Sequence, residues 1–350
     1  MSKGKNLSPL LPDRHPQPDF FVCDIFDSAP KSDQASMEYP LFTLSTKPDM
    51  AMREYAKGDK WLKLSPSPVG LATVHDRDIL IYCISQCMAK LNRGEKIAKT
   101  LRFPASDLLM VTNRKTSGEG YRLFKQALRR LQGTQIETNI TTGNVEQWEV
   151  FSFIDSAKTI RESREGRMLE MEITLSDWVF NAIEEQGGEI LTISRDYFRL
   201  RKPLERRLYE LARKHCGTNN EQWSFKVETL HDRTGSQSPL KEFRRMLKAI
   251  MDNQAHIPDY AFRLENDTVY IYPKAKFQEA FNPPPLPETV SGITLKPETL
   301  EKAKRYARGL DVSFLEKEWR AMLQDKNSIP KKPDGSFINY VKWYVRKSNA

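Results

Sequence analysis

Two stretches of this chain place lysine and arginine opposite apolar residues at helical spacing, a pattern that lets a helix contact nucleic acid. The first stretch runs from Ser106 to Gly133 and the second from Val227 to Gln254. Each has a short apolar helix, a turn rich in glycine and serine, and a longer helix with a basic face. Such a face can neutralise phosphates or hydrogen-bond to base edges.

The long helix of the second stretch has its buried face defined by Leu240, Phe243, Leu247 and Ile250. Its opposite face carries the candidate DNA-binding residues Lys241, Arg244, Arg245 and Lys248, and Arg233 in the preceding short helix is a further candidate. A helix of this kind fits the major groove. The arginines could bind guanine with two hydrogen bonds or could only neutralise phosphates, and the sequence leaves both roles open.

The long helix of the first stretch follows the same logic. Tyr121, Phe124, Leu128 and Leu131 are expected in the core. The residues expected on its exposed face are Arg122, Lys125, Arg129 and Arg130. The turn before this helix adds the candidates Arg114 and Lys115, beside backbone N–H groups that could hold phosphates.

A candidate β-hairpin follows each long helix. The first would turn at Thr142-Gly143-Asn144 and the second at Asn266-Asp267. Helix, turn, helix and hairpin in this order are typical of a winged-helix module. The pattern therefore predicts an α+β protein with two tandem winged-helix domains and a small C-terminal helical unit. The competing interpretation is that both basic faces are ordinary solvated surfaces.

Composition narrows the class of protein. The 350 residues are 39% hydrophobic and 29% charged, and the net charge of +9 favours a polyanionic partner. Neither a membrane span nor a secretory signal is expected, and the cysteine spacing suits a reducing, cytoplasmic compartment. Cys83 and Cys87, four residues apart, are expected to pack in the core and not to hold a metal.

Changes in composition along the chain predict five parts. Residues 1–36 are expected to be a flexible arm, 37–165 and 166–275 the two winged-helix domains, 276–297 a Pro-rich linker, and 298–350 a helical domain. A helix from Asp76 or Asp78 to about Asn92 is apolar on nearly every side, so we expect it to be buried in the first domain.

The C-terminal domain combines aromatic and basic residues, namely Phe337, Tyr340, Trp343 and Tyr344 with Lys342, Arg346 and Lys347. They could stack on single-stranded bases or dock a host initiator, helicase or primase. Alternatively, Phe337, Tyr340 and Tyr344 only pack their helix against its neighbours.

The sequence lacks the motifs of the enzyme classes that act at replication origins. The histidines never form the His-x-His metal site of a nicking enzyme, and the chain has no G-x-x-x-x-G-K-[ST] loop for an ATPase. Asp76 and Asp78 have the spacing of paired catalytic carboxylates, but we expect both to cap a helix. No enzyme activity, cofactor or metal is therefore expected.

Three stretches resemble the plasmid replication initiator protein A family: PLFTLSTKPD, WLKLSPSPVGLATVHDRDILIYCISQ and DLLMVTNRKTSGEGYRLFKQALRRLQGTQIETNI. The resemblance covers about residues 38–275. It implies a protein that binds double-stranded DNA at origin repeats, helps to open the duplex and recruits host replication machinery. A transcriptional regulator built from the same modules is the alternative.

The resemblance also implies a division of labour between the two domains. The second domain would read the major groove, with Lys241, Arg244, Arg245 and Lys248 as readers of bases or phosphates. The first would contact the backbone of the other half of the site and form a homodimer. Its candidate contacts are Arg114, Lys115, Arg122, Lys125 and Arg129.

Overall fold

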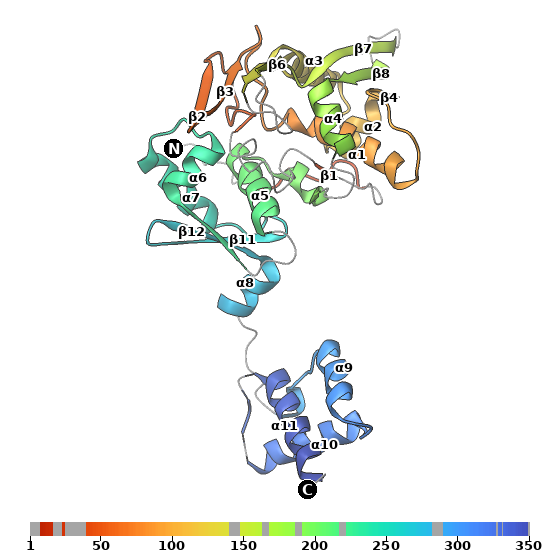
Figure 1. Ribbon diagram of the computed structural model, residues 1–350, viewed down its shortest axis with the longest axis vertical. Helices are drawn as coiled ribbons and strands as arrows, with labels where there is room; N and C mark the ends of the chain where they lie inside the picture. Colours follow the sequence, from red (N-terminus) through yellow and green to blue (C-terminus); the bar gives the residue numbers. More distant parts are fainter. Residues whose placement is uncertain are drawn as a thin grey trace, which may run out of the picture. The chain divides into compact units, whose positions relative to one another are not determined.

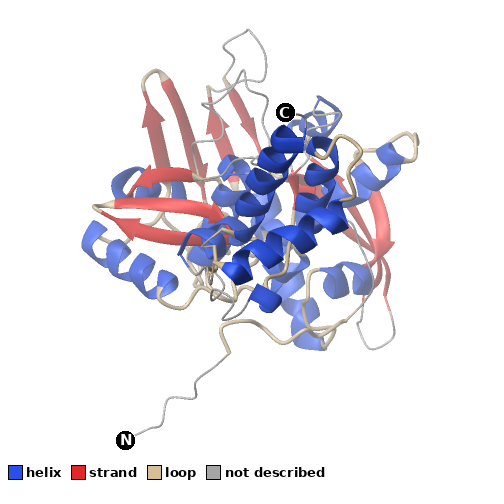
Figure 2. Cartoon of the chain, turned by 90° about the horizontal axis from the view of Figure 1, so that it is seen from below, coloured by secondary structure: helices blue, strands red, loops and turns tan. Residues whose placement is uncertain are grey.

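Short helices alternate with antiparallel strands along much of the chain in the computed structural model (Figure 1, and Figure 2 coloured by secondary structure). The structure describes residues 8–16, 23–24, 40–139, 148–162, 168–185, 191–216, 222–281, 290–326, 328–330 and 332–348. Contacts divide the chain into unit 1, Met1–Phe277, and unit 2, Gln278–Ala350. Unit 1 mixes helices and strands, whereas the elements described beyond α8 in unit 2 are helical.

Unit 1 begins with a lobe, here called the first lobe, that contains two small sheets. Their strand orders are β2-β3-β5-β6 and β4-β8-β7, and all pairings are antiparallel. The elements of this lobe are β2 (Arg53–Lys57), β3 (Lys60–Ser65), α1 (Arg77–Asn92), β4 (Thr100–Pro104), α2 (Ala105–Val111), α3 (Gly118–Gly133), β5 (Gln135–Thr138), β6 (Glu149–Phe151), β7 (Ile154–Glu162), β8 (Met168–Leu175) and α4 (Asp177–Glu185). One core joins them, and the buried side chains of α1 lie at its centre, as predicted.

The second lobe of unit 1 has a three-stranded sheet in the order β10-β12-β11. Its elements are β9 (Leu191–Thr192), which pairs with β1 (Cys23–Asp24), η1 (Arg195–Arg199), α5 (Pro203–Cys216), β10 (Trp223–Lys226), α6 (Val227–Thr234), α7 (Leu240–Met251), β11 (Tyr260–Glu265), β12 (Thr268–Pro273) and α8 (Lys274–Phe281). Phe243, Leu247 and Ile250 of α7 are buried in its core, as their spacing predicted, whereas Leu240 of the same predicted face is only partly buried.

The two lobes share one order of elements. In each, a helix precedes a strand, two helices and two more strands, and the first strand pairs with the last: α1-β4-α2-α3-β7-β8 and α5-β10-α6-α7-β11-β12. The first lobe differs by inserting β5 and β6 between α3 and β7, where they extend the sheet begun by β2 and β3.

The predicted hairpins have different outcomes. Asn266 and Asp267 have positive φ angles of 45° and 61° between β11 and β12, so the second hairpin is confirmed. The turn predicted at 142–144 lies outside the described residues, although β5 and β6 on either side of it do pair. The strands equivalent to β11 and β12 in the first lobe are instead β7 and β8.

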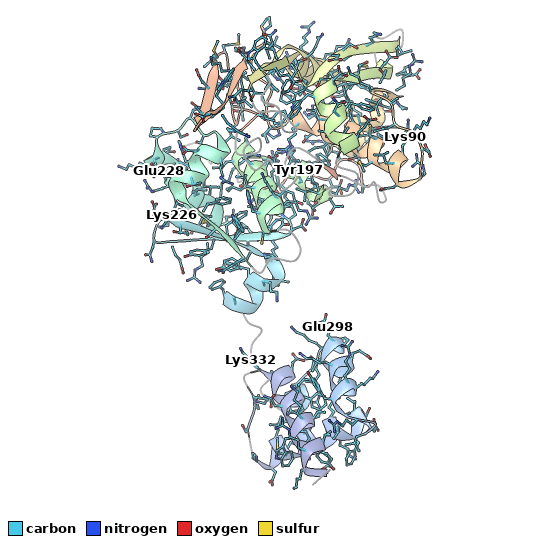
Figure 3. All side chains as sticks on the ribbon, in the orientation of Figure 1. Lys90, Tyr197, Lys226, Glu228, Glu298 and Lys332 are labelled. Atoms are coloured by element: carbon cyan, nitrogen blue, oxygen red, sulfur yellow. The ribbon has the colours of Figure 1, made fainter. Side chains whose placement is uncertain are left out.

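Buried ion pairs join the two lobes. Arg77 of α1 contacts Glu210 of α5 at 2.5 Å, and Arg206 of α5 contacts Asp78 of α1 at 2.6 Å. The Tyr197 hydroxyl donates to Glu210 at 2.6 Å, and its buried ring is labelled in Figure 3. Ile81 of α1 also belongs to the core of the second lobe. The lobes are therefore packed together through buried charge and apolar contact.

Part of the predicted flexible arm, residues 8–16, makes hydrogen bonds with both lobes. Leu11 N–H donates to Arg199 O at 2.8 Å, and Arg14 donates to the carbonyl of Asn113 at 2.6 Å. The Asn113 side chain in turn donates to Pro12 O at 3.0 Å. The prolines of the predicted arm interrupt any helical pattern in its sequence. They do not prevent an extended segment of it from binding to both lobes.

Unit 2 is built from η2 (Val290–Gly292), α9 (Pro297–Tyr306), α10 (Val312–Asp325) and α11 (Pro333–Ser348). Trp319, Phe337 and Val341 are fully buried in its own core. Asp311 caps α10 by accepting a hydrogen bond from Ser313 N–H at 2.9 Å.

The predicted domain boundary between residues 165 and 166 would separate β7 from its partner β8. Met171, Ile173 and Ile183 lie in the core of the first lobe. We propose to place the division within unit 1 after α4, because β8 and α4 complete that core. The remaining predicted boundaries stay predictions.

Candidate nucleic-acid interface

The exposed face of α7 carries four cations. Lys241, Arg245 and Lys248 are exposed and Arg244 is about half-buried, while the apolar face of the same helix packs into the core. Pro239 fixes the start of the helix, and Gly235 adopts a left-handed φ of 69° that ends α6 and allows the turn. Lys241 and Lys248 are seven residues apart, which separates them by roughly 10 Å along one side of the helix.

Both arginines of this face make exchangeable ion pairs. Arg244 contacts Asp267 in the β11–β12 turn at 2.8 Å, and Arg245 contacts Glu242 at 2.6 Å. Hydrogen bonds from these arginines lower the pKa of both carboxyl groups. Exposed pairs of this kind contribute little to stability. A phosphate or a guanine edge can therefore replace the carboxylate as the acceptor for either guanidinium.

The exposed face of α3 is the second basic surface. Arg122, Lys125 and Arg129 are exposed there, whereas Tyr121, Phe124, Leu128 and Leu131 are buried, as their spacing predicted. Lys115, in the turn before α3, is exposed and contacts Glu119 at 3.2 Å. These side chains can reach the phosphates of a duplex.

Two arginines of the first stretch point inward. Arg114 donates to the carbonyl oxygen of His75 and lies 3.7 Å from Asp78. Arg130, predicted to be exposed, instead makes two hydrogen bonds of 2.7 Å with Asp76, and its side chain is only 18% exposed. The prediction for Arg130 was wrong because Asp76 comes from a distant part of the sequence. DNA contact by Arg114 stays a prediction, and its geometry favours a positioning role.

Arg233 packs within its own lobe. Its guanidinium lies 5.0 Å from the centre of the Phe225 ring and 3.1 Å from the His215 ring nitrogen. Its carbonyl oxygen accepts hydrogen bonds from Arg207. Contact of Arg233 with DNA also stays a prediction.

The paired carboxylates of α1 are held by arginine. Asp76 occupies the N-cap position, but its side chain makes no cap hydrogen bond and binds Arg130 instead. Asp78 binds Arg206. The expectation that both side chains cap the helix was therefore wrong, and both anchor tertiary ion pairs.

A groove beside α7 adds residues that the sequence did not single out, and its cations are paired: Arg53 contacts Asp49 at 2.8 Å and Lys202 contacts Glu205 at 3.0 Å. Its volume is about 610 Å³, and Arg53, Lys202 and Arg245 line it together with Ser236 and Ser238. Arg53 donates to the Gln237 side chain at 2.8 Å, which joins β2 to the turn before α7. No local pattern marked Arg53 or Lys202, because the groove forms only when chain segments distant in sequence meet.

Lys226 is a second basic residue that sequence reasoning missed. It is exposed at the end of β10, where Figure 3 labels it, and it donates to Thr268 Oγ1 at 3.1 Å. Its charge contributes to lowering the pKa of Asp267, so it lies near the Arg244 ion pair. It extends the basic surface from α7 toward the β11–β12 turn.

Among the described residues, no cluster of three or more histidine, cysteine, aspartate or glutamate side chains is arranged to hold a metal ion. Over the same residues, no helix combines the length and apolar character needed to cross a membrane. Cys83 and Cys87 are both buried in the first core and unbonded.

Known proteins share parts of this sequence. The family described as Replication initiator protein A matches residues 31–262. A "Putative replication protein" of Wigglesworthia glossinidia brevipalpis is 38% identical over 249 residues, covering 70% of this chain and 89% of that protein.

Two solved structures of RctB fragments are also similar. One contains domains 2 and 3 and matches with a TM-score of 0.49 at 12% identity, over 67% of this chain and 94% of that one. The other, of the same two domains, matches with a TM-score of 0.46 at 11% identity, over 69% and 97%.

Proposed function

Because this chain belongs to the replication initiator protein A family, we propose that it starts plasmid replication by binding double-stranded DNA at repeats of its origin. In this proposal it acts in the bacterial cytoplasm, helps to open the duplex and recruits host replication machinery. The observation that carries DNA binding is the row of cations on α7, which lies opposite the buried side chains of Phe243, Leu247 and Ile250.

We propose that each lobe of unit 1 is a winged-helix domain. The shared order of elements supports this, with β11–β12 and β7–β8 as the hairpins beside the long helices α7 and α3. In such domains the long helix enters the major groove. The Arg244–Asp267 pair places a cation of α7 against the hairpin turn, so both elements can approach one duplex.

The two basic helices are proposed to contact separate parts of one DNA site. Lys241, Arg244, Arg245 and Lys248 would contact bases or phosphates, with Arg53 and Lys202 beside them. Lys115, Arg122, Lys125 and Arg129 would bind phosphates of the other half. The buried pairs Arg77–Glu210 and Arg206–Asp78 support a fixed spacing between the halves, because breaking either pair would leave a charge buried.

Self-association through the first lobe is part of the proposal. Its four-stranded sheet ends at β2 and β6, and an edge strand offers unpaired backbone groups to another chain. Sedimentation should show a dimer. We expect this self-association to compete with origin binding. A monomer at all concentrations would remove this part of the proposal.

A non-catalytic role is also proposed. The carboxylates Asp76 and Asp78 are each bound to arginine and thus serve the tertiary structure. Incubating the protein with supercoiled origin DNA and Mg²⁺ or Mn²⁺ should leave both strands intact. Cleavage of one strand would contradict this part.

Footprinting across the DNA that flanks the gene tests the proposed function. We expect protection of repeated tracts, and binding that weakens steeply with salt because each neutralised phosphate releases counterions. The absence of any protected tract at moderate ionic strength would overturn it. An origin-dependent plasmid maintenance assay then separates an initiator from a transcriptional regulator, since a regulator would bind without supporting replication.

A further inference from the structure

Unit 2 has an aromatic surface at the edge of its own core. We call it the aromatic face, and it consists of Tyr306, Phe314, Tyr340, Trp343 and Tyr344. The ring centres of Tyr340 lie 5.6 Å from Trp343 and 5.9 Å from Tyr344. Phe314 of α10 continues the series at 6.2 Å from Tyr344. Four of the five rings thus form one continuous cluster on α10 and α11.

The aromatic face is open to solvent at Tyr306, Phe314 and Trp343, whereas Tyr340 and Tyr344 are partly buried against the core. Trp343 is 52% exposed and Phe314 45% exposed. Phe337 and Trp319 are fully buried. Phe337 therefore packs its helix against the neighbours, and Tyr340 and Tyr344 contribute to that packing from its edge, whereas Trp343 lies outside this core in the described part of the chain. Large exposed rings gathered in one place mark a binding surface.

Cations accompany these rings. The Lys347 ammonium lies 5.2 Å from the Trp343 ring centre, and the Lys342 ammonium lies 4.3 Å from that of Tyr306. Arg346 is exposed between them in sequence. Residues 278–350 contain 13 lysines and arginines against 9 aspartates and glutamates. The charge and the rings together suit a ligand that has both phosphates and flat bases.

We propose that the aromatic face binds single-stranded DNA. Bases would stack on Trp343 and its neighbouring rings, and Lys342, Arg346 and Lys347 would bind the phosphates between them. A closed duplex cannot offer its base faces to these rings, so the ligand is an unpaired strand. The inference rests on the proposed function, because duplex opening at the origin would supply that strand.

Binding of a fluorescent 20-nucleotide oligo-dT to the full-length protein, followed by anisotropy, tests this. Trp343→Ala should weaken binding at least about fivefold, since loss of one stacking ring has effects of that size or larger. Trp343→Phe should retain most of the affinity. Lys347→Gln should reduce the steepness with which affinity falls as salt rises.

Trp148→Ala is the matched control, because that indole in the first lobe is 64% exposed. Its binding of oligo-dT should be unchanged. Unchanged binding by Trp343→Ala, or an equal loss with Trp148→Ala, would overturn the inference. The inference would also be overturned if the Trp343→Ala protein bound oligo-dT normally but no longer captured a host helicase or primase. In that case the aromatic face would bind protein and not DNA.

Binding of the origin duplex separates this inference from the proposed function. Trp343→Ala should bind the duplex normally, and a variant with Arg244→Ala and Arg245→Ala should lose the duplex yet keep oligo-dT binding. If the wild-type protein binds the origin duplex but Trp343→Ala leaves oligo-dT binding unchanged, the aromatic face is misassigned. If the wild-type protein binds no origin duplex, the proposed function fails.

Discussion

Arginine serves two different purposes in this protein, and the difference lies in what each guanidinium contacts. Arg206 is buried against Asp78 and also donates to the carbonyl oxygens of Leu200 and Phe198. Arg245 is 71% exposed and contacts only the neighbouring Glu242 among the described residues. The first kind of arginine fixes the fold, and the second remains available to a ligand.

Asp78→Asn should test the buried kind. The substitution leaves Arg206 charged and without its carboxylate partner in the interior, so we expect the free energy of unfolding to fall by about 3–5 kcal/mol. Urea denaturation measures it, and Glu301→Gln, which breaks the exposed pair with Lys304, is the control with little expected change. Similar small losses for both variants would contradict the role assigned to this pair.

His75 should make the folded state sensitive to acid. Burial and the nearby positive charges of Arg206, Arg114 and Arg130 hold its pKa well below the ordinary value of 6.5. The unfolded chain takes up a proton below that pH while the folded chain does not, so stability is lost as the pH falls from about 6.5 toward the folded pKa. His75→Gln should lose less stability than wild type between pH 7.5 and 5.5 in urea titrations; identical losses would refute this.

At the scale of elements, the turn before α7 depends on contact between the lobes. Gly235 has a φ of 69°, and a Cβ atom there would lie 2.6 Å from Cγ of Pro40. The glycine thus permits both the left-handed turn and the close approach of the first lobe. This contact helps to set where α7 presents its cations.

Gly235→Ala should destabilise the protein by more than the backbone strain alone, which is about 1–2 kcal/mol. Gly58→Ala isolates that strain, because Gly58 has a φ of 61° and a Cβ atom added there would have no neighbour within 4 Å. Thermal or urea unfolding of both variants gives the comparison. Equal destabilisation would show that the contact with Pro40 does not constrain the turn.

Elements defined by local patterns could be predicted from the sequence. The buried faces of α3 and α7, the apolar helix α1 and the turn at Asn266-Asp267 all follow from the spacing of residues close in sequence. The pairing of β7 with β8 and the sheet that joins β2 and β3 to β5 and β6 could not be predicted this way. Which strands pair is determined by packing between segments far apart in the sequence. The sequence of a single strand carries little information about its partner.

The same limit applies to the candidate site. Helical periodicity identified Lys241, Arg244, Arg245 and Lys248 on one face, but it also placed Arg130 in solvent, where the structure places it against Asp76. Arg53 and Lys202 join the groove beside α7 only through the docking of the two lobes. Which cations are free for a ligand therefore depends on their tertiary partners.

At the scale of the whole molecule, the lobes of unit 1 form one body and unit 2 has a separate core. Buried ion pairs and the segment 8–16 join the lobes. In our account, unit 1 binds the duplex at a fixed geometry, and unit 2 binds the strand that opening exposes. The net charge of +9 serves both steps, although its distribution matters more than its total.

The most direct measurement is the affinity of full-length protein for its origin repeat, with Arg244 and Arg245 both changed to alanine, against the same change at Lys302 and Lys304. All four residues lie on helices, and Lys302 and Lys304 are exposed on α9, so each pair removes two cations from a helix surface. We predict at least about a tenfold loss for the α7 pair and a much smaller loss for the α9 pair. Equal losses would contradict the claim that α7 presents the DNA-binding surface.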